Sequence, residues 1–420
     1  MLRFSTQRSW SFTRTGPCPL ISTASPFSKE KLAPIPLFPA ATAPLLLTSY
    51  IIILRDASFS TICDRISALH ERALSQLNNR HEVAAYTDYE DLLADENVDA
   101  IGLCVRCKEQ GAMAAQALEA GKHVNSEVPA AHTIEDCWRI VTAVERTGLV
   151  YHLAEQRRYG GFFDAWRNIV AEGRIGRVTY GEAQYFHCYQ PFWTFQDPET
   201  GKFYSVEELP SHPEAKPNWL YYMPPIHYLP HDLSPMLKVL DDRVVEVTAM
   251  STRTPSYSHP EFKHVPDMQV ALMKTEKDAI LRMATSFTQP FPQRDTHWYH
   301  VIGTRGCLEW RRSWCDQPKM WLANSQMHGL AEVDWRWERT DAPPEAHGTG
   351  HNDTDYYVHI AFRDAMLGIK ALEFDVYRAI DTAAPAILAA ESIAQGTKLM
   401  HVPNFRPSDE RSAGEMPKEF

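Results

Sequence analysis

Residues 98–124 read VDAIGLCVRCKEQGAMAAQALEAGKHV, and this stretch decides the fold class. The apolar run Val98–Cys104 predicts a strand, Gln110–Ala120 predicts a helix, and Gly121 suits the position after a helix because glycine readily adopts left-handed backbone angles. His123-Val124 begins the next strand. A strand, a helix and a second strand in such short register are typical of a parallel sheet with helices on its faces.

The alternation of strands and helices continues on both sides of this stretch. Further strands are predicted at Ser60–Cys63 and Leu149–Leu153, and further helices at Ile66–Leu77, Tyr89–Ala94 and Thr133–Thr147. The first part of the chain is therefore expected to form an α/β domain around a parallel sheet.

The pattern changes after about residue 155. Polar and apolar residues alternate in several stretches, as in half-buried antiparallel strands, and these stretches are Val178–Cys188, Val244–Thr252, Met268–Met273, Ala279–Phe287, His297–Gly303 and Cys307–Arg311. Helices are predicted at Gly161–Glu172, Tyr356–Leu367 and Ala383–Gly396, and the Pro- and aromatic-rich residues 191–225 predict a long loop. These features indicate a second domain of the α+β type.

Composition excludes several classes of function. The 420 residues include 42 Lys and Arg against 53 Asp and Glu, and a formal net charge of −11 disfavours nucleic acid and membrane surfaces as partners. Eight cysteines are too few for a disulfide scaffold, which favours a reducing compartment. Cys104 and Cys107 form a C-x-x-C without a second ligand pair, so no metal site is predicted.

The N-terminal segment differs from the rest of the chain. Residues 1–29 are rich in Ser and Thr, contain four basic residues and precede the first acidic residue, Glu30, as in a mitochondrial presequence. A disordered or wrongly assigned start is the other interpretation, and a cytoplasmic location is the first expectation. The uncharged stretch Leu32–Leu54 contains four prolines, which disfavour a membrane-spanning helix.

Several motifs together resemble the Gfo/Idh/MocA oxidoreductases. They are Ala85–Leu93, Val98–Ile101, Ala117–Val124, Gly173–Val178, Ile302–Gly306, Ala390–Gly396 and Val402–Phe405, and the resemblance runs from about residue 59 to about residue 406. It implies a Rossmann domain and a C-terminal domain with a large open, mostly antiparallel sheet, through which copies of the chain form a homo-oligomer. It also implies NAD or NADP as cofactor and a sugar-like or polyol substrate.

The first βα unit of such a Rossmann domain is missing from the sequence. No Gly-x-Gly-x-x-Gly turn precedes Asp64, and the only candidate first strand, Tyr50–Leu54, ends four residues before the next strand. A parallel crossover needs about a dozen residues or more. We expect an extension at 1–45, a truncated NAD(P)-binding domain at 46–155, a substrate and oligomerisation domain at 156–408 and a flexible tail at 409–420. Either a wrong gene model, which we favour, or loss of the cofactor explains the gap.

Four residues are candidates for cofactor binding. The resemblance places Asp64 after the second Rossmann strand, where a carboxylate binds the adenosine ribose and favours NAD, although Asp64 also suits a helix N-cap. Arg65 follows it and is suited to the 2′-phosphate of NADP. Glu127 and Gln156 lie at strand ends, where open α/β sheets bind ligands or where structural hydrogen bonds form.

The proton-transfer residues depart from the common family pattern. Val128 stands where most of the family has the lysine of Glu-Lys-Pro. Glu-Val-Pro-Ala-Ala and the stretch Pro225–Pro235 resemble a sub-branch that contains NAD-dependent α-N-acetylgalactosaminidases. The resemblance makes His231 the first catalytic candidate, since an imidazole exchanges protons near neutral pH, and Tyr185 the second.

Three further residues are expected to bind substrate. His187 lies two residues after Tyr185, so both side chains point to one face of the same strand. His227 and Tyr228 precede His231 and are expected to border the same site. Core packing of the tyrosine or a hydrogen bond from histidine to a loop carbonyl is the alternative in each case.

Three functions follow from these residues. The first is an NAD(P)-dependent oxidoreductase that transfers a hydride between nicotinamide and a hydroxyl-bearing carbon of a small molecule. The second is an NAD-dependent glycosidase in which transient oxidation of the sugar allows elimination of the glycosidic bond. The third is a non-catalytic family member without cofactor, which only the missing glycine-rich turn supports.

Overall fold

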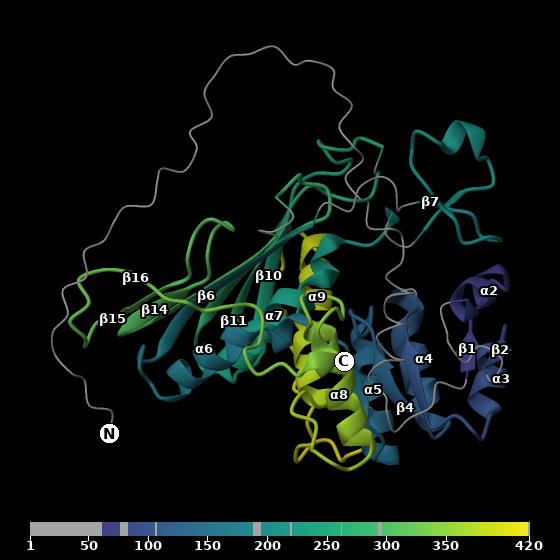
Figure 1. Cartoon of the computed structure of the whole chain (residues 1–420), viewed down its shortest axis with the longest axis horizontal. Coiled ribbons are helices and arrows are strands. Elements are labelled where there is room, and N and C mark those ends of the chain that lie inside the picture. The colour runs from purple at the N-terminus through teal and green to yellow at the C-terminus, as the bar shows by residue number, and fades with distance from the viewer. Residues whose placement is uncertain are drawn as a thin grey trace. The chain divides into compact units, whose positions relative to one another are not determined.

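The computed structural model describes residues 61–75, 83–105, 107–187, 195–218, 221–261, 263–292 and 296–418. The predicted extension at 1–45 and the candidate strand Tyr50–Leu54 lie outside these residues. No helix within the described ranges is long and apolar enough to cross a membrane. Figure 1 shows the order of the elements along the chain.

The first domain contains parallel strands in two groups. Strands β1 (Thr61–Cys63) and β2 (Ala84–Tyr86) pair with each other, and β3 (Ala100–Leu103), β4 (His123–Ser126) and β5 (Tyr151–Leu153) form a second parallel sheet. Helices α2 (Ala68–Leu74), α3 (Tyr89–Ala94), α4 (Cys107–Glu119) and α5 (Ile134–Thr147) alternate with these strands. The predicted α/β class is confirmed.

Local signals explain where these helices begin and end. The side chain of Asp88 accepts a hydrogen bond from the Glu90 amide at the start of α3, and Thr133 caps α5 in the same way. Gly148 follows α5 with φ of 69°, a left-handed angle that glycine adopts without steric cost.

The described strands of the first domain form two separate groups. Among the described residues no pairing joins β1 to β3, which is where a Rossmann sheet carries its first strand. The sequence contains no glycine between Gly16 and Gly102. A glycine-rich phosphate turn therefore cannot form at this point of the chain.

The second domain is built on a nine-stranded sheet. Its order is β16-β15-β14-β13-β6-β12-β11-β10-β17, and every neighbouring pair is antiparallel except β12 and β6. The strands are β6 (Val178–Phe186), β10 (Val244–Ser251), β11 (Gln269–Thr275), β12 (Ile280–Ser286), β13 (His297–Gly303), β14 (Gly306–Glu309), β15 (Lys319–Leu322), β16 (Ala331–Glu332) and β17 (Met400–His401). This confirms the expected large, mostly antiparallel sheet.

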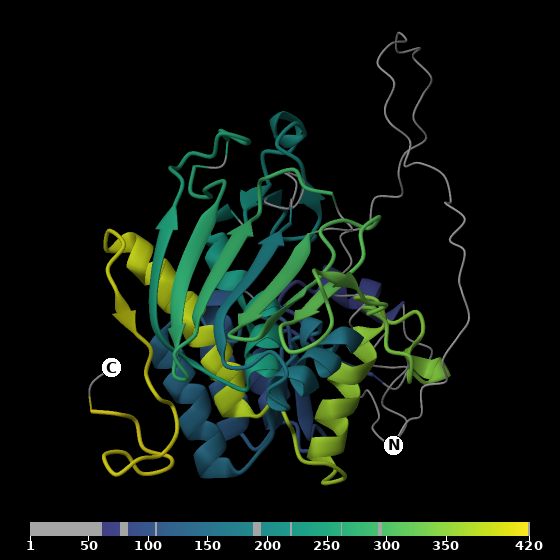
Figure 2. The same ribbon diagram turned by 90° about the vertical axis from the view of Figure 1, so that its left-hand side faces the viewer.

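Helices α7 (Pro230–Leu240) and α9 (Val376–Ala394) pack against one face of this sheet, and α6 (Gly161–Ala171) packs on α7. Helix α8 (Thr354–Met366) packs against the short 3₁₀ helices η2 (Arg157–Tyr159) and η8 (Pro344–Ala346). The other short 3₁₀ helices in the connections are η4 (Leu209–Ser211) and η6 (Pro225–Tyr228). Figure 2 shows the strands side by side with α9 running behind them. The alternation in β11 follows this layering, because Ala271 and Met273 are buried while Leu272 and Lys274 are exposed.

Two features within or beside the predicted loop were not anticipated. Residues 195–217 contain a small antiparallel sheet of β7 (Phe195–Gln196), β8 (Phe203–Tyr204) and β9 (Lys216–Pro217). Helix α7 follows the loop and contains Pro235 in its interior. Proline disfavours the interior of a helix but is tolerated in its first turn. Helix α7 can therefore begin at Pro230.

The C-terminal segment is held against α5. Arg411 is 7% exposed and contacts both carboxylate oxygens of Glu145 on α5 at 2.8 Å. Its guanidinium also donates to the carbonyl of Phe405 at 2.8 Å. The segment predicted as a flexible tail from residue 409 therefore contacts α5 through Arg411, Gly414 and Met416.

Candidate functional site

A histidine and a carboxylate from different domains meet at the carboxyl end of β5. His231 is the second residue of α7, and its Nδ1 atom lies 2.9 Å from Oε2 of Glu155, which follows β5. Glu155 is fully buried, and its other oxygen accepts a hydrogen bond from the Arg157 amide at 2.9 Å. With Nδ1 facing Glu155, the Nε2 atom of His231 is the nitrogen that can exchange a proton with a ligand.

Aromatic side chains surround His231. The Tyr185 ring lies edge-on to the His231 ring with centroids 5.2 Å apart, and the Tyr228 ring lies 5.5 Å from His231. Tyr228 stacks on Tyr185 at 6.4 Å, and His187 lies 5.8 Å from Tyr185. The structure therefore brings together both predicted catalytic residues and two of the three predicted substrate residues.

The chemistry of His187 follows from its burial. Burial, and then the positive charges of Arg157 and His231, lower the pKa of His187 to about 4. His187 is neutral at physiological pH and offers hydrogen bonds rather than charge.

His227 takes a different place from the other predicted substrate residues. It lies in η6, is 4% exposed, and its ring contacts His132 with centroids 4.4 Å apart. Burial, and then His132, lower the pKa of His227 to about 3. His227 therefore packs against His132, in the loop that follows β4, rather than against the rings around Tyr185.

A buried acid beneath Tyr185 was not anticipated from the sequence. Asp232 is fully buried, and its Oδ1 atom lies 2.8 Å from Nδ1 of His297 and accepts a hydrogen bond from the Tyr299 hydroxyl. The His297 ring stacks on Tyr185 at 4.8 Å. Burial raises the pKa of Asp232 well above its usual value. The alternation of β13 places His297 and Tyr299 on one strand face, which is the only sequence signal for this layer.

Glu127 and Gln156 lie at the ends of neighbouring parallel strands, as predicted. Burial, and then the negative charge of Asp355, raise the pKa of Glu127 to about 8, and the Gln156 side chain hydrogen-bonds the same carboxyl group. Glu127 is thus protonated at neutral pH and can donate a hydrogen bond.

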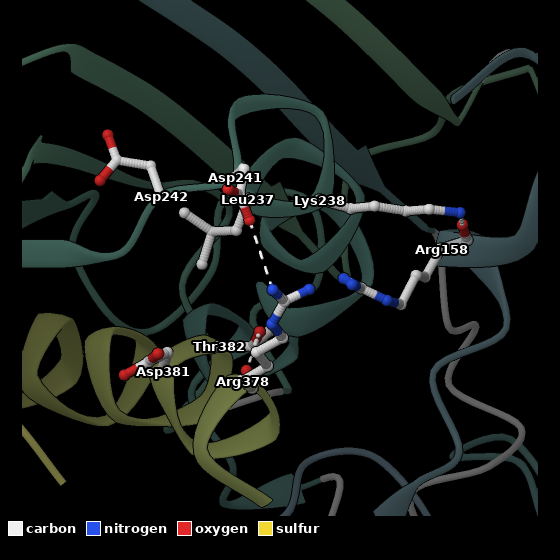
Figure 3. A pocket seen from close by; sticks show the side chains of 8 residues that line it. All are labelled: Arg158, Leu237, Lys238, Asp241, Asp242, Arg378, Asp381 and Thr382. Carbon is white, nitrogen blue, oxygen red and sulfur yellow. Dashed lines mark hydrogen bonds and ion pairs between the residues drawn. The ribbon is translucent and has the colours of Figure 1, made fainter. Parts of the chain in front are cut away.

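A charged network behind the site joins the segment after β5 to α7 (Figure 3). Arg158 is 2% exposed and donates to the carbonyl of Ser234 at 3.1 Å and to Glu373 at 2.7 Å. Lys238 donates to the carbonyl of Arg158 at 3.0 Å and pairs with Asp164 at 2.7 Å. These bonds fix the distance between the segment that carries Glu155 and the helix that carries His231. The residues that line the small cavity beside this network are Arg158, Leu237, Lys238, Asp241, Asp242, Arg378, Asp381 and Thr382.

The predicted adenosine-binding residues lie together at the carboxyl end of β1. The Oδ1 atom of Asp64 accepts a hydrogen bond from the Ile66 amide at 2.8 Å, so the residue does cap a turn. Arg65 is exposed and lines a cavity of ≈ 310 Å³, across which Lys216 of β9 contributes a second cation. Two cations thus line this cavity, and the carboxylate of Asp64 precedes Arg65 in the chain.

Metal ligation has no support in the described ranges, where no group of three or more His, Cys, Asp or Glu side chains is placed to hold an ion.

Two known protein families match separate parts of the chain. The one described as "Oxidoreductase family, NAD-binding Rossmann fold" matches residues 47–155. The one described as "Glycosyl hydrolase 109, C-terminal domain" matches residues 244–409. A glycosyl hydrolase family 109 protein of Shewanella sp. (strain W3-18-1) is 25% identical over 391 residues, covering 84% of this chain and 80% of the relative. A protein of the same description from Shewanella baltica (strain OS195) matches equally.

Solved structures share the fold. Levoglucosan dehydrogenase in complex with NADH and levoglucosan matches with a TM-score of 0.63 at 17% identity, covering 86% of this chain and 95% of that one. An oxidoreductase from Agrobacterium radiobacter, in complex with NAD+, L-tartaric acid and magnesium, matches with a TM-score of 0.62, the same identity and the same coverage. At this level of identity the likeness is one of fold.

Proposed function

We propose that the chain is an oxidoreductase of the Gfo/Idh/MocA type, since residues 47–155 match the oxidoreductase family with an NAD-binding Rossmann fold, and that it moves a hydride between a nicotinamide dinucleotide and a hydroxyl-bearing carbon of a sugar-like substrate. The single observation that carries this proposal is the His231–Glu155 contact beside Tyr185, at the carboxyl ends of the parallel strands. Ligands of open α/β sheets bind at that edge.

The residues of this chain supply proton transfer and orientation. Nε2 of His231 takes the proton of the substrate hydroxyl as that carbon is oxidised, and the carboxylate of Glu155 stabilises the resulting imidazolium. Neutral Glu127 and His187 hold other substrate hydroxyls by hydrogen bonds. A bound dinucleotide, which Asp64, Glu127 and Gln156 would hold, would supply the hydride transfer that no side chain can perform.

NAD is the cofactor we propose, on the strength of Asp64. A carboxylate in this position accepts hydrogen bonds from both ribose hydroxyls of NAD and repels the 2′-phosphate of NADP. Arg65 and Lys216 are the features that favour NADP instead. Because no glycine-rich turn holds the pyrophosphate, we expect weak binding of either dinucleotide, and a chain that binds neither would support the non-catalytic alternative.

A second function, glycoside cleavage by transient oxidation, has its own support. Val128 occupies the position of the family lysine, and residues 244–409 match the C-terminal domain of glycosyl hydrolase family 109. Such a reaction returns the hydride to the sugar and consumes no NAD.

We also propose that copies of the chain associate through the open face of the nine-stranded sheet. Met250, Leu272 and Ile280 point to this face and are 68%, 50% and 41% exposed. Apolar side chains exposed side by side mark an interface. Sedimentation velocity of the purified chain and of Leu272→Asp tests this, since a dimer should become a monomer in the variant, and an unchanged sedimentation coefficient contradicts the proposal.

The test of function begins with calorimetric titration of the purified chain with NAD and NADP. Turnover is then measured on free sugars by NADH fluorescence and on methyl and nitrophenyl glycosides by product release. His231→Asn is the matched variant. Oxidation or cleavage that is lost in this variant supports the proposal, and a folded chain that binds no dinucleotide overturns it.

A further inference from the structure

A second histidine–carboxylate pair lies close to the His231–Glu155 pair. Nδ1 of His351 lies 2.7 Å from Oδ1 of Asp355, the second residue of α8. The Asp355 side chain is 4% exposed whereas that of His351 is 35% exposed. Asp355 therefore holds one ring nitrogen from the protein interior, and Nε2 is left on the accessible side.

The backbone around His351 is built to hold this ring in place. His351, Asn352 and Asp353 have φ of 54°, 57° and 69°, three consecutive left-handed residues that are not glycine. A side chain on Gly350 would place its Cβ 2.2 Å from Oδ2 of Asp355, so only glycine fits there. The hydroxyl of Thr354 donates to the His351 carbonyl at 2.8 Å. Backbone strain of this kind persists where the surrounding structure enforces it, and it clusters at functional sites.

Three contacts place this pair beside the first one. Helix α8 packs against η2, which follows Glu155 and Gln156, and Tyr357 of α8 stacks on Tyr159 of η2 at 6.4 Å. The carboxylate of Asp355 is the neighbouring charge that most raises the pKa of Glu127. Glu155 also raises this pKa, so the carboxylates of both pairs lie within electrostatic range of Glu127 at the end of β4.

The number of proton-transfer groups distinguishes the two candidate reactions. Oxidation of a hydroxyl releases one proton for each hydride, and the His231–Glu155 pair suffices for it. Cleavage of a glycoside by transient oxidation also requires a proton for the departing oxygen, and that oxygen lies on a different carbon from the oxidised hydroxyl. A site with two separate pairs suits the second reaction.

We propose that His351, held by Asp355, is the acid that protonates the leaving oxygen of a glycoside. This inference rests on the proposed function, which supplies the oxidised sugar through the nicotinamide. A base in the site removes a proton from the carbon next to the ketone. The electron pair of the broken carbon–hydrogen bond then forms a carbon–carbon double bond. The bond to the glycosidic oxygen breaks with its electrons, and this oxygen takes the proton from Nε2 of the His351 imidazolium, which becomes neutral imidazole.

Leaving-group dependence tests the assignment. A nitrophenolate departs without an acid whereas a methoxide does not. His351→Gln should therefore reduce cleavage of methyl glycosides about 10²–10⁴-fold and cleavage of 4-nitrophenyl glycosides less than about tenfold. Equal losses for both leaving groups would overturn the proposal, as would a wild-type chain that oxidises sugars and cleaves no glycoside. The matched control is His347→Gln, because His347 contacts Asp353 at 3.0 Å in the same segment but its side chain is 64% exposed.

A second readout needs no cofactor. ¹⁵N NMR of the histidine side chains should show neutral His351 protonated at Nδ1, and Asp355→Asn should abolish that preference. If the wild-type chain binds no dinucleotide, the proposed function fails. The tautomer of His351 still shows in that case whether Asp355 holds its Nδ1 atom. A mixed tautomer in the wild-type chain overturns the inference by itself.

Discussion

The Nδ1 atom of His231 lies 2.9 Å from the fully buried carboxylate of Glu155, and the two residues belong to different domains. The contact fixes which ring nitrogen of His231 faces the protein and leaves Nε2 as the nitrogen that can meet a ligand.

Glu155→Gln should lower kcat about 10–100-fold with a smaller change in KM, because the amide keeps the shape but loses the charge that stabilises imidazolium. Steady-state kinetics across pH 5–9 checks this. Glu214→Gln is the matched control, since Glu214 makes a 2.9 Å contact with His212 at the surface. Equal effects of the two variants would contradict a role for Glu155.

Glu127 should make the stability of the fold depend on pH. Its pKa of about 8 in the folded chain lies above its usual value of 4.5, so the folded chain retains a proton that the unfolded chain releases. The free energy of unfolding is then unaffected by this group below pH 4.5 and falls as the pH rises to about 8. Thermal unfolding at several pH values should show this fall in the wild-type chain and a smaller one in Glu127→Gln. The exposed Glu172→Gln should behave like the wild-type chain.

Arg158→Leu should reduce the free energy of unfolding by about 3 kcal/mol, because it removes a buried cation whose partners then lose their bonds. Arg167 provides the control. It lies 3.8 Å from the same carboxylate, Glu373, but is 40% exposed, so Arg167→Leu should change stability little. Urea denaturation measures the free energy of unfolding of both variants. Similar losses in the two variants would contradict a stabilising role of Arg158.

Gly350→Ala should reduce the cleavage of methyl glycosides as His351→Gln does, while the chain still folds and still oxidises free sugars. The added Cβ would meet Asp355 at 2.2 Å and displace the carboxylate that holds His351. Gly329→Ala adds the same atom where nothing lies within 4 Å and should leave kcat unchanged. The rate of methyl glycoside cleavage is compared with the melting temperature of each variant. A Gly350→Ala enzyme that cleaves methyl glycosides at the wild-type rate would show that the position of Asp355 does not matter.

Cofactor preference should respond to residues on both sides of the cavity beside β1. Asp64→Asn should weaken NAD binding about tenfold, since a charged acceptor of two ribose hydrogen bonds is lost. Lys216→Ala should leave the affinity for NAD unchanged and weaken any binding of NADP. Calorimetry with both dinucleotides checks this, and a Lys216→Ala effect on NAD alone would contradict the assignment of the cavity.

Regular elements were predictable because their signals are local. Helix α3 begins and ends at the predicted residues, Tyr89 and Ala94, since Asp88 caps it. The sequence did not predict α7, because the favourable first-turn position of Pro230 can be recognised only once the preceding turn is known. Residues 195–217 were expected to be a loop because strands of two residues leave no periodic signal.

The sequence predicted the rings around His231 but not the buried carboxyl groups of Glu155 and Asp232. His231, Tyr185, His187 and Tyr228 come together as expected, while their roles stay predictions. Glu155 was missed because sequence alone does not say which of two adjacent polar residues, Glu155 or Gln156, faces a helix from another domain. The layer of Asp232, His297 and Tyr299 depends on contacts between α7 and β13, which no local pattern encodes.

The contacts of Glu145 with the second domain and the C-terminal segment bear on how ligands enter the site. On α5 it accepts a hydrogen bond from Tyr377 of α9 and contacts Arg411 of the C-terminal segment, both at 2.8 Å. The chain thus passes from the first domain to the second, and its C-terminal segment then binds to the first domain again. Two-domain enzymes often admit substrate by swinging apart about a hinge. Here that swing would have to break the buried Arg411–Glu145 ion pair, so this contact opposes a hinge motion between the domains.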